Sequence, residues 1–233
     1  MAGNRDEFHA RPTAPLSRWE DAPGVMGGRD LRSGGGWAGV GADGRMAVVT
    51  NVRDPQAAQG GASRGALVAD YLRADVSAAA AADHLAPDVA DYPPFNLVLA
   101  DAESACYLGN HPVARATLRP GVHGMSNGPL DAPWPKTRRL MDALGHWCTA
   151  DTPSLDRLWD ALADEHRPDP AELPDTGIGL QREHWLGAAF IRGDEYGTRA
   201  STIILIDHAG KGTLHERRFG PRGAAEGSGL LSF

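Results

Sequence analysis

The sequence has few cysteines, few lysines and no long apolar run. Only Cys106 and Cys148 occur among 233 residues, without CxxC spacing. This excludes a disulfide framework and gives no zinc signature, so two buried free thiols are expected. No stretch approaches the ~20 apolar residues of a membrane span. Charge begins at Arg5, which predicts no signal peptide and a cytoplasmic protein.

Basic residues are outnumbered by acidic ones, 23 to 30, and the formal net charge is −7. Lys136 and Lys211 are the two lysines, so arginine carries most of the positive charge, as in proteins from GC-rich bacterial genomes. A nucleic-acid-binding protein normally has a basic stripe. The densest basic clusters, 136–139 and 217–218, are too short for one. No nucleic-acid partner is predicted, and the composition does not indicate an oligomeric state.

Hydrophobic periodicity and turn residues predict strands near both ends of the chain and helices in the middle. Asp43-Gly44 between two apolar runs is typical of a β-hairpin. The expected strands are 37–40, 45–50, 95–101, 105–108, 188–191, 201–206 and 213–216. The expected helices begin at Ser63 and cover 77–85, 136–148 and 154–165. This order favours an α+β fold in one domain, 1–233, with residues 220–233 as a frayed glycine-rich tail.

Polar clusters occur where the predicted strands end, which is where a site would be built. Each cluster alone also has a structural interpretation, because Arg-Asp pairs form salt bridges and Asn-Gly-Pro forms turns. The clusters are Asn4-Arg5-Asp6-Glu7, Gly27-Gly28-Arg29-Asp30, Thr50-Asn51, Ser126-Asn127-Gly128-Pro129 and Tyr196-Gly197-Thr198-Arg199.

In this order, and with Pro133-Trp134-Pro135-Lys136, the clusters resemble the family named for its Asn-Arg-Asp-Glu (NRDE) motif, the relatives of transport and Golgi organisation protein two. That family is similar to the N-terminal-nucleophile hydrolases. The resemblance implies an αββα sandwich, with two antiparallel sheets between helix layers. It also implies pocket residues Arg5, Asp6, Asn51, Asn127 and Arg199, and no required cofactor.

The sequence departs from the family at its N-terminus. Relatives run from Met-Cys through a strand before the motif, whereas here Met1-Ala2-Gly3 alone precedes it. The nucleophile is absent, and the first strand is apparently missing. Unpaired neighbouring backbone would be costly, so we expect the codons upstream of Met1 to encode Met-Cys and a strand.

Three functions remain open. The resemblance implies a carrier of a small, partly apolar ligand, either haem or acyl-coenzyme A, in haem mobilisation or acyl-lipid homeostasis. His9, His123 and His184 are candidate haem ligands. The alternative is cysteine-dependent hydrolysis of linear or cyclic amides, with Asp6 holding the α-amine and Asn51 or Asn127 stabilising an oxyanion. The third is an interaction module with an interface formed by Trp134, Trp147, Trp159 and Trp185, although aromatics at helical spacing more often pack in a core.

Overall fold

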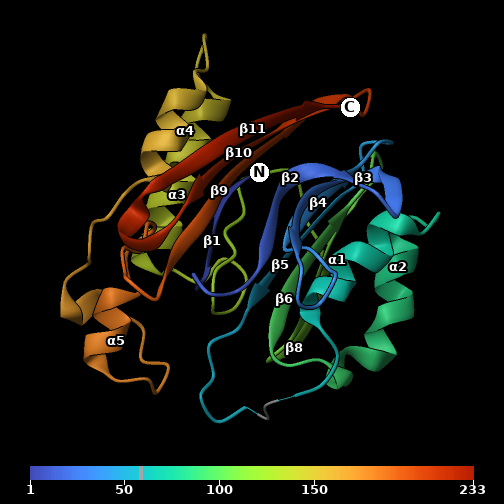
Figure 1. The fold of residues 1–233 in the computed structure, drawn as a ribbon. Coiled ribbons are helices and arrows are strands. Elements are labelled where there is room, and N and C mark those ends of the chain that lie inside the picture. The colour runs from blue at the N-terminus through green and yellow to red at the C-terminus, as the bar shows by residue number, and fades with distance from the viewer. Residues whose placement is uncertain (58–59) are drawn as a thin grey trace.

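Two antiparallel sheets form the centre of the molecule in a computed structural model, which describes residues 1–57 and 60–233 (Figure 1). The larger sheet has the order β2-β3-β4-β5-β6-β7-β8 and joins strands that follow one another in the chain. They are Thr13–Trp19, Ala22–Asp30, Ala38–Gly41, Met46–Asn51, Phe95–Ala100, Ala105–Asn110 and Val113–Thr117.

The smaller sheet, β1-β9-β10-β11, combines both ends of the chain. Its strands are Ala2–Phe8, Tyr196–Ile206, Gly212–Phe219 and Ala225–Ser232. Strand β1 pairs antiparallel with β9 from Ala2 to Phe8, and β9 then pairs with β10. One wall of the molecule therefore depends on contacts between residues about 190 positions apart.

Helices cover the outer faces of both sheets, as Figure 1 shows. Helices α1 (Arg64–Arg73) and α2 (Ala78–Leu85) pack on the large sheet, while α4 (Leu155–Leu162) packs on β1 and β9, with α3 (Pro135–Cys148) beside it. Helix α5 is Leu180–Trp185. Three short 3₁₀ turns are Ala86–Asp91, Pro170–Glu172 and Pro221–Gly223. This layering confirms the predicted α+β fold with two antiparallel sheets.

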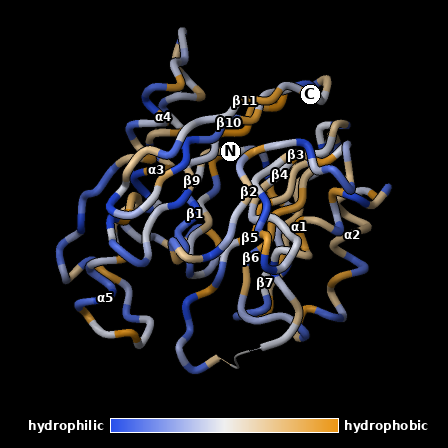
Figure 2. The backbone as a smooth tube through the Cα atoms, in the orientation of Figure 1, coloured by the Kyte–Doolittle hydropathy of each residue, from blue (hydrophilic) through white to orange (hydrophobic). Residues whose placement is uncertain are grey.

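Three groups of apolar side chains lie between these layers. One fills the space between α1, α2 and the large sheet, including fully buried Phe95 and Leu97. The second lies between the sheets, and the third between the small sheet and α3 and α4. Figure 2 shows the hydrophobic residues along the central strands of the large sheet. Trp159 belongs to the third group at 8% exposure, which favours the core interpretation for this tryptophan.

Local signals predicted several elements correctly. Asp43-Gly44 joins β4 to β5, with Gly44 at φ 81°, where a side chain would be strained. The Ser77 side chain accepts a hydrogen bond from the Ala80 main chain at the start of α2. The hairpin of β6 and β7 and the helices α1 and α3 also form where expected.

The structure also corrects several expectations. No strand was predicted at the Asn4-Arg5-Asp6-Glu7 motif, but the motif lies within strand β1, at the edge of the small sheet. The tail expected to fray forms β11, since its main chain pairs with β10. Residues 188–191 form no strand; their main chain instead bonds to Asp164 and Thr198. Cys106 is buried as predicted, but Cys148 is exposed at the end of α3.

Candidate functional site

A cavity of about 730 Å³ lies between the two sheets and is closed on one side by α3. Its walls come from β1, β5, β9, α3, the loop 123–130 and the start of α1. Four of the five predicted site residues line it, namely Arg5, Asp6, Asn51 and Asn127. Volumes of about 300–1,000 Å³ are usual for small-molecule sites. The size and the lining make this cavity the candidate binding site.

Asp6 lies on β1 next to a bulge in the pairing with β9. The Thr198 hydroxyl donates to Asp6 Oδ1 at 2.6 Å, and the Thr198 hydroxyl oxygen accepts from the Ile191 N–H at 2.9 Å. Burial raises the pKa of the Asp6 carboxyl, while Lys136 and the Thr198 hydrogen bond oppose that rise. Asp6 is thus a fixed carboxyl group with an elevated pKa, suited to exchanging a proton or accepting a hydrogen bond.

Lys136 faces Asp6 across the cavity from the first turn of α3, just after Pro135. Its ammonium donates to the Leu186 carbonyl oxygen at 3.1 Å. Burial lowers the pKa of Lys136 to about 8, and the Asp6 charge partly offsets this. No ion pair within 4 Å involves Lys136 among residues 1–57 and 60–233. Its remaining N–H donors can therefore serve a ligand.

A buried ion pair adjoins these two groups. Arg53 Nη1 and Glu183 Oε2 are 2.5 Å apart, and the Glu183 side chain is only 2% exposed. The Thr176 hydroxyl and N–H both donate to Glu183 Oε1. The main-chain N–H of Arg53 also donates to the main-chain carbonyl oxygen of Asn127 at 2.7 Å. This pair joins α5 to the loop that carries Asn127.

The two predicted asparagines meet at the cavity wall. The Asn127 side chain donates to the Asn51 carbonyl oxygen at 2.9 Å. The Thr50 hydroxyl donates to Ser126 O at 2.6 Å, and the buried Asn96 amide donates to Ser126 O and to Gly128 O. These bonds hold the 126–128 loop against the end of β5. The large sheet thus positions both asparagines.

Arg5 extends from β1 into the space between the sheets. Its guanidinium lies 4.6 Å from the centre of the Trp37 ring. Glu7 and Asp30 are 3.6 and 3.9 Å from Arg5 Nη2, and Arg11 shares both carboxylates. Burial lowers the pKa of the Arg5 guanidinium, which Glu7 and Asp30 partly offset. Arg5 stays charged because the arginine guanidinium is not deprotonated in proteins.

Arg199 is the one predicted site residue that does not line the cavity. Its Nη1 donates to the carbonyl oxygens of Phe8, His9 and Arg11, so it fixes the turn after β1. It faces a separate space of about 40 Å³, which Arg5 also borders. Arg199 therefore stabilises, from outside the cavity, the end of strand β1, which also carries Asp6.

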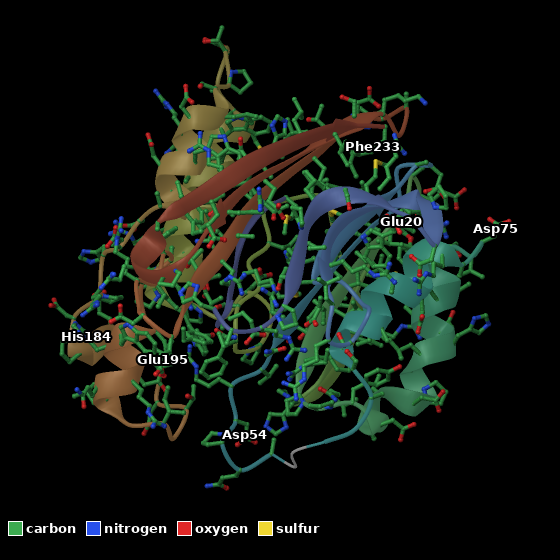
Figure 3. All side chains as sticks on the ribbon, viewed as in Figure 1. Glu20, Asp54, Asp75, His184, Glu195 and Phe233 are labelled. Carbon is green, nitrogen blue, oxygen red and sulfur yellow. The ribbon has the colours of Figure 1, made fainter. Side chains whose placement is uncertain are left out.

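The candidate haem ligands do not gather at the site. His123 lines the cavity, but Nδ1 bonds Asp131 and Nε2 bonds the Arg119 carbonyl oxygen. His184 lies on α5 at the edge of the molecule (Figure 3). His9 lies outside the cavity lining, and its ring nitrogens are buried. No group of three metal-binding side chains occurs within the described ranges.

Sequence reasoning missed Lys136, Arg53 and Glu183 as site residues. Lys136 carried a usable signal, since it is one of two lysines in the chain and lies in the first turn of a predicted helix. The positive end of a helix dipole disfavours a cation there, so a lysine at that position needs another reason. The meeting of Arg53 with Glu183 has no local signal, because 130 residues separate them.

These features define an α+β protein with a ligand-sized, charge-containing cavity between two antiparallel sheets. The chain belongs to the Transport and Golgi organisation 2 family, whose family model matches residues 1–221. This confirms the resemblance inferred from the polar clusters. Among the described helices, none combines the length and apolar character needed to cross a membrane.

Similar curated proteins come from vertebrates and an insect. Transport and Golgi organization protein 2 homologs of Bos taurus and Homo sapiens are each 32% identical to this chain. Both alignments cover 93% of this chain and 85% of the relative. Transport and Golgi organization protein 2 of Drosophila melanogaster is 29% identical, covering 91% of this chain and 82% of the relative. The similarity extends along nearly the whole chain.

Proposed function

We propose that this protein binds a small ligand with a polar head and an apolar body in the cavity between its sheets, and carries it. The observation behind this proposal is a polarity gradient shared by the cavity walls. On α3, the lining residues Lys136, Leu140 and Leu144 are four residues apart. Such residues share one helix face, and eight residues of helix span about 12 Å.

The two strand walls carry the same gradient. On β5, Thr50 lies at the polar end and Val48 and Met46 follow, while β1 runs from Asp6 back to Ala2 and Met1. Met1, Met46 and Val48 all pack against the apolar group between the sheets. Ala2, Leu140 and Leu144 all pack against the apolar group between the small sheet and helices α3 and α4. At their apolar ends, the three walls therefore belong to the two apolar groups on either face of the small sheet.

This gradient favours an acyl group over haem as the apolar body. A linear chain can lie along α3 with its polar head near Lys136 and Asp6. Haem would need an axial His, Cys or Tyr ligand. Among the described lining residues, the one histidine, His123, has both ring nitrogens hydrogen-bonded, and no cysteine is present. Tyr196 is the remaining candidate, and burial raises the pKa of its hydroxyl. Loss of the phenol proton is therefore disfavoured.

Amide hydrolysis is the second candidate, and the position of Asp6 supports it. Asp6 shares the cavity with Asn51, Asn127 and the amino-terminal residue Met1. Ser126 and Thr202 line the same cavity, and their hydroxyl groups are candidate nucleophiles among the lining residues. Release of amine from acyl-amino and lactam substrates would support this function.

Ligand titration tests the proposed carrier. Purified protein is titrated with an acyl-coenzyme A by calorimetry and with haem by absorption spectroscopy. Leu144→Arg places a charge at the apolar end of the cavity and should weaken acyl binding by about tenfold or more. Leu180→Arg is the matched control, because Leu180 is 60% exposed on α5 and does not line the cavity. Failure of both ligands to bind at micromolar concentration would overturn the proposal.

A further inference from the structure

The start of α1 forms a separate polar corner of the cavity. Residues 60–65, which lead into this ten-residue helix, all line the cavity. The first turn contains no acidic residue, and the Ser63 side chain makes no capping hydrogen bond. Within the described ranges, the N–H groups of Arg64 and Gly65 have no hydrogen-bond acceptor. An uncapped helix start combines unpaired donors with the positive end of the helix dipole.

A second loop packs against this helix start. The Gly36 N–H donates to the Gly65 carbonyl oxygen at 3.2 Å. A Cβ atom on Gly35 would lie 2.3 Å from that carbonyl group, so only glycine allows this approach. Asp30 holds the loop by accepting from the main-chain N–H groups of Arg32 and Ser33. Arg32 and Ser33 consequently line the cavity together with Ser63 and Arg64.

Positive charge exceeds negative charge at this corner. The cavity is lined by four arginines, Arg5, Arg11, Arg32 and Arg64. The carboxylates that interact with Arg5, Arg11 and Arg64 among them are Glu7 and Asp30. Both carboxylates are shared by Arg5 and Arg11. Neither Arg32 nor Arg64 forms an ion pair with any described residue. Arg64 Nη1 donates to the Pro94 carbonyl oxygen at 3.0 Å, which fixes its guanidinium near the helix start.

Arg5 provides an independent indication of an absent acceptor. Its side chain is only 9% exposed, and it lines the same cavity. Its Nη1 atom is buried without a hydrogen-bond partner in the described part of the chain. An unsatisfied buried donor on a charged group is costly. A bound oxyanion would supply the missing acceptor.

We propose that this corner binds a phosphate group of the ligand, which gives the cavity a second anchoring point. This inference rests on the proposed function, because it adds phosphate to the chemistry of the ligand held there. Uncapped amides at a helix N-terminus and forked guanidinium groups are the donors that proteins use for phosphate. The several oxygens of a phosphate match this number of donors better than a single carboxylate does.

Pyrophosphate is the probe for the corner, measured by calorimetry and by ³¹P nuclear magnetic resonance. Arg64→Met should weaken its binding by about tenfold or more, because one charged donor is lost. Arg73→Met is the matched control, since Arg73 lies in the last turn of the same helix and pairs with Asp21. Equal affinity of the Arg64 variant and the unmodified protein, or no binding at millimolar pyrophosphate, would overturn the inference.

Ser63→Asp separates loss of binding from loss of folding. Aspartate is a favourable N-cap residue and complements the helix dipole, so this variant should fold at least as stably as the unmodified protein. Its carboxylate would occupy the free amides and repel phosphate. We expect pyrophosphate binding to disappear while the circular dichroism spectrum and melting temperature are retained. Undiminished binding in this variant would contradict the proposal.

Two further experiments are needed. One distinguishes a lipid headgroup from a soluble phosphate, and the other distinguishes the phosphate site from the proposed carrier function. Sedimentation with phosphatidic acid vesicles, without binding of soluble pyrophosphate, would overturn the inference, because the corner lies inside the cavity. A fatty acid without phosphate tests the apolar end alone. The phosphate site is wrong and the carrier function is supported if the fatty acid binds to the unmodified protein, Leu144→Arg weakens that binding, and pyrophosphate does not bind. If pyrophosphate binds through Arg64 but no acyl ligand binds, the carrier function fails.

Discussion

The two sheets that enclose the cavity differ in how the chain builds and holds them. The large sheet is a meander of consecutive strands packed on α1 and α2 by apolar side chains. The small sheet joins β1 to β9 across most of the chain, and polar contacts such as Asp6 to Thr198 reinforce it. Asp6 therefore lies on the cavity wall with long-range strand pairing. The large sheet acts as a scaffold, and the small sheet positions Arg5 and Asp6.

The scaffold role of the large sheet is tested by Phe95→Ala. Phe95 is fully buried in the core beneath α1 and α2. Loss of its ring should lower the free energy of unfolding by about 3–5 kcal/mol, through lost burial and the cavity left behind. Urea denaturation measures this effect. Val113→Ala is the control, since Val113 is 78% exposed and should change stability by roughly 0.5 kcal/mol or less. Similar losses in both variants would contradict the comparison.

Lys136 tests the charged side of the cavity through pH. Its folded-state pKa lies near 8 because of burial, below the ordinary value of 10.5. The protonated ammonium is thus disfavoured in the fold, so its cost is present below pH 8 and is relieved as pH rises toward 10.5. The stability of the unmodified protein relative to Lys136→Met should rise over this interval, by up to roughly 1.4 kcal/mol per pH unit.

Denaturation of both proteins from pH 6 to 10.5 measures that difference. Tyrosines and other lysine or arginine residues titrate equally in the two proteins, and the subtraction removes them. A difference that stays constant from pH 8 to 10.5 would show that the Lys136 ammonium keeps its ordinary pKa in the fold.

Local turn and capping chemistry made part of the fold predictable. Asp43-Gly44 and the Ser77 cap act over a few residues, so β4, β5 and α2 followed from the sequence. Strand β11 did not, because its glycine-rich sequence lacks an apolar alternation and gains order by pairing with β10. The position of the Asn-Arg-Asp-Glu motif within β1 depends on β9, about 190 residues away.

The candidate site was also predicted in part from the sequence. The resemblance named Arg5, Asp6, Asn51 and Asn127, which line one cavity. It also named Arg199, whose guanidinium points to the turn after β1, because its three carbonyl acceptors lie there. Side-chain direction along β9 depends on register and on a bulge, which the sequence does not reveal. The roles of these residues in binding or chemistry remain predictions.

Thr198→Val tests the polar contacts of the small sheet. Its expected effect on the free energy of unfolding is the smallest of the three substitutions. The Thr198 hydroxyl donates to Asp6 and accepts from the Ile191 N–H, and valine of the same shape can do neither. Loss of these bonds should cost about 1–2 kcal/mol of unfolding free energy at neutral pH. It should also raise the pKa of Asp6 further, because the Thr198 bond favours the charged carboxylate.

The elevated pKa of Asp6 fixes the sign of the pH dependence. A carboxyl group whose folded pKa exceeds its unfolded value destabilises the fold when ionised, and protonation relieves this cost as pH falls through the folded pKa. The deficit of Thr198→Val should therefore shrink on acidification. Thr202→Val is the matched control, because Thr202 is also buried on β9 and lines the cavity, but its hydroxyl has no hydrogen bond to any described residue. That control should be neutral or slightly stabilising. If both variants lose stability equally at every pH, then the Asp6 hydrogen bond contributes nothing specific to this wall of the cavity.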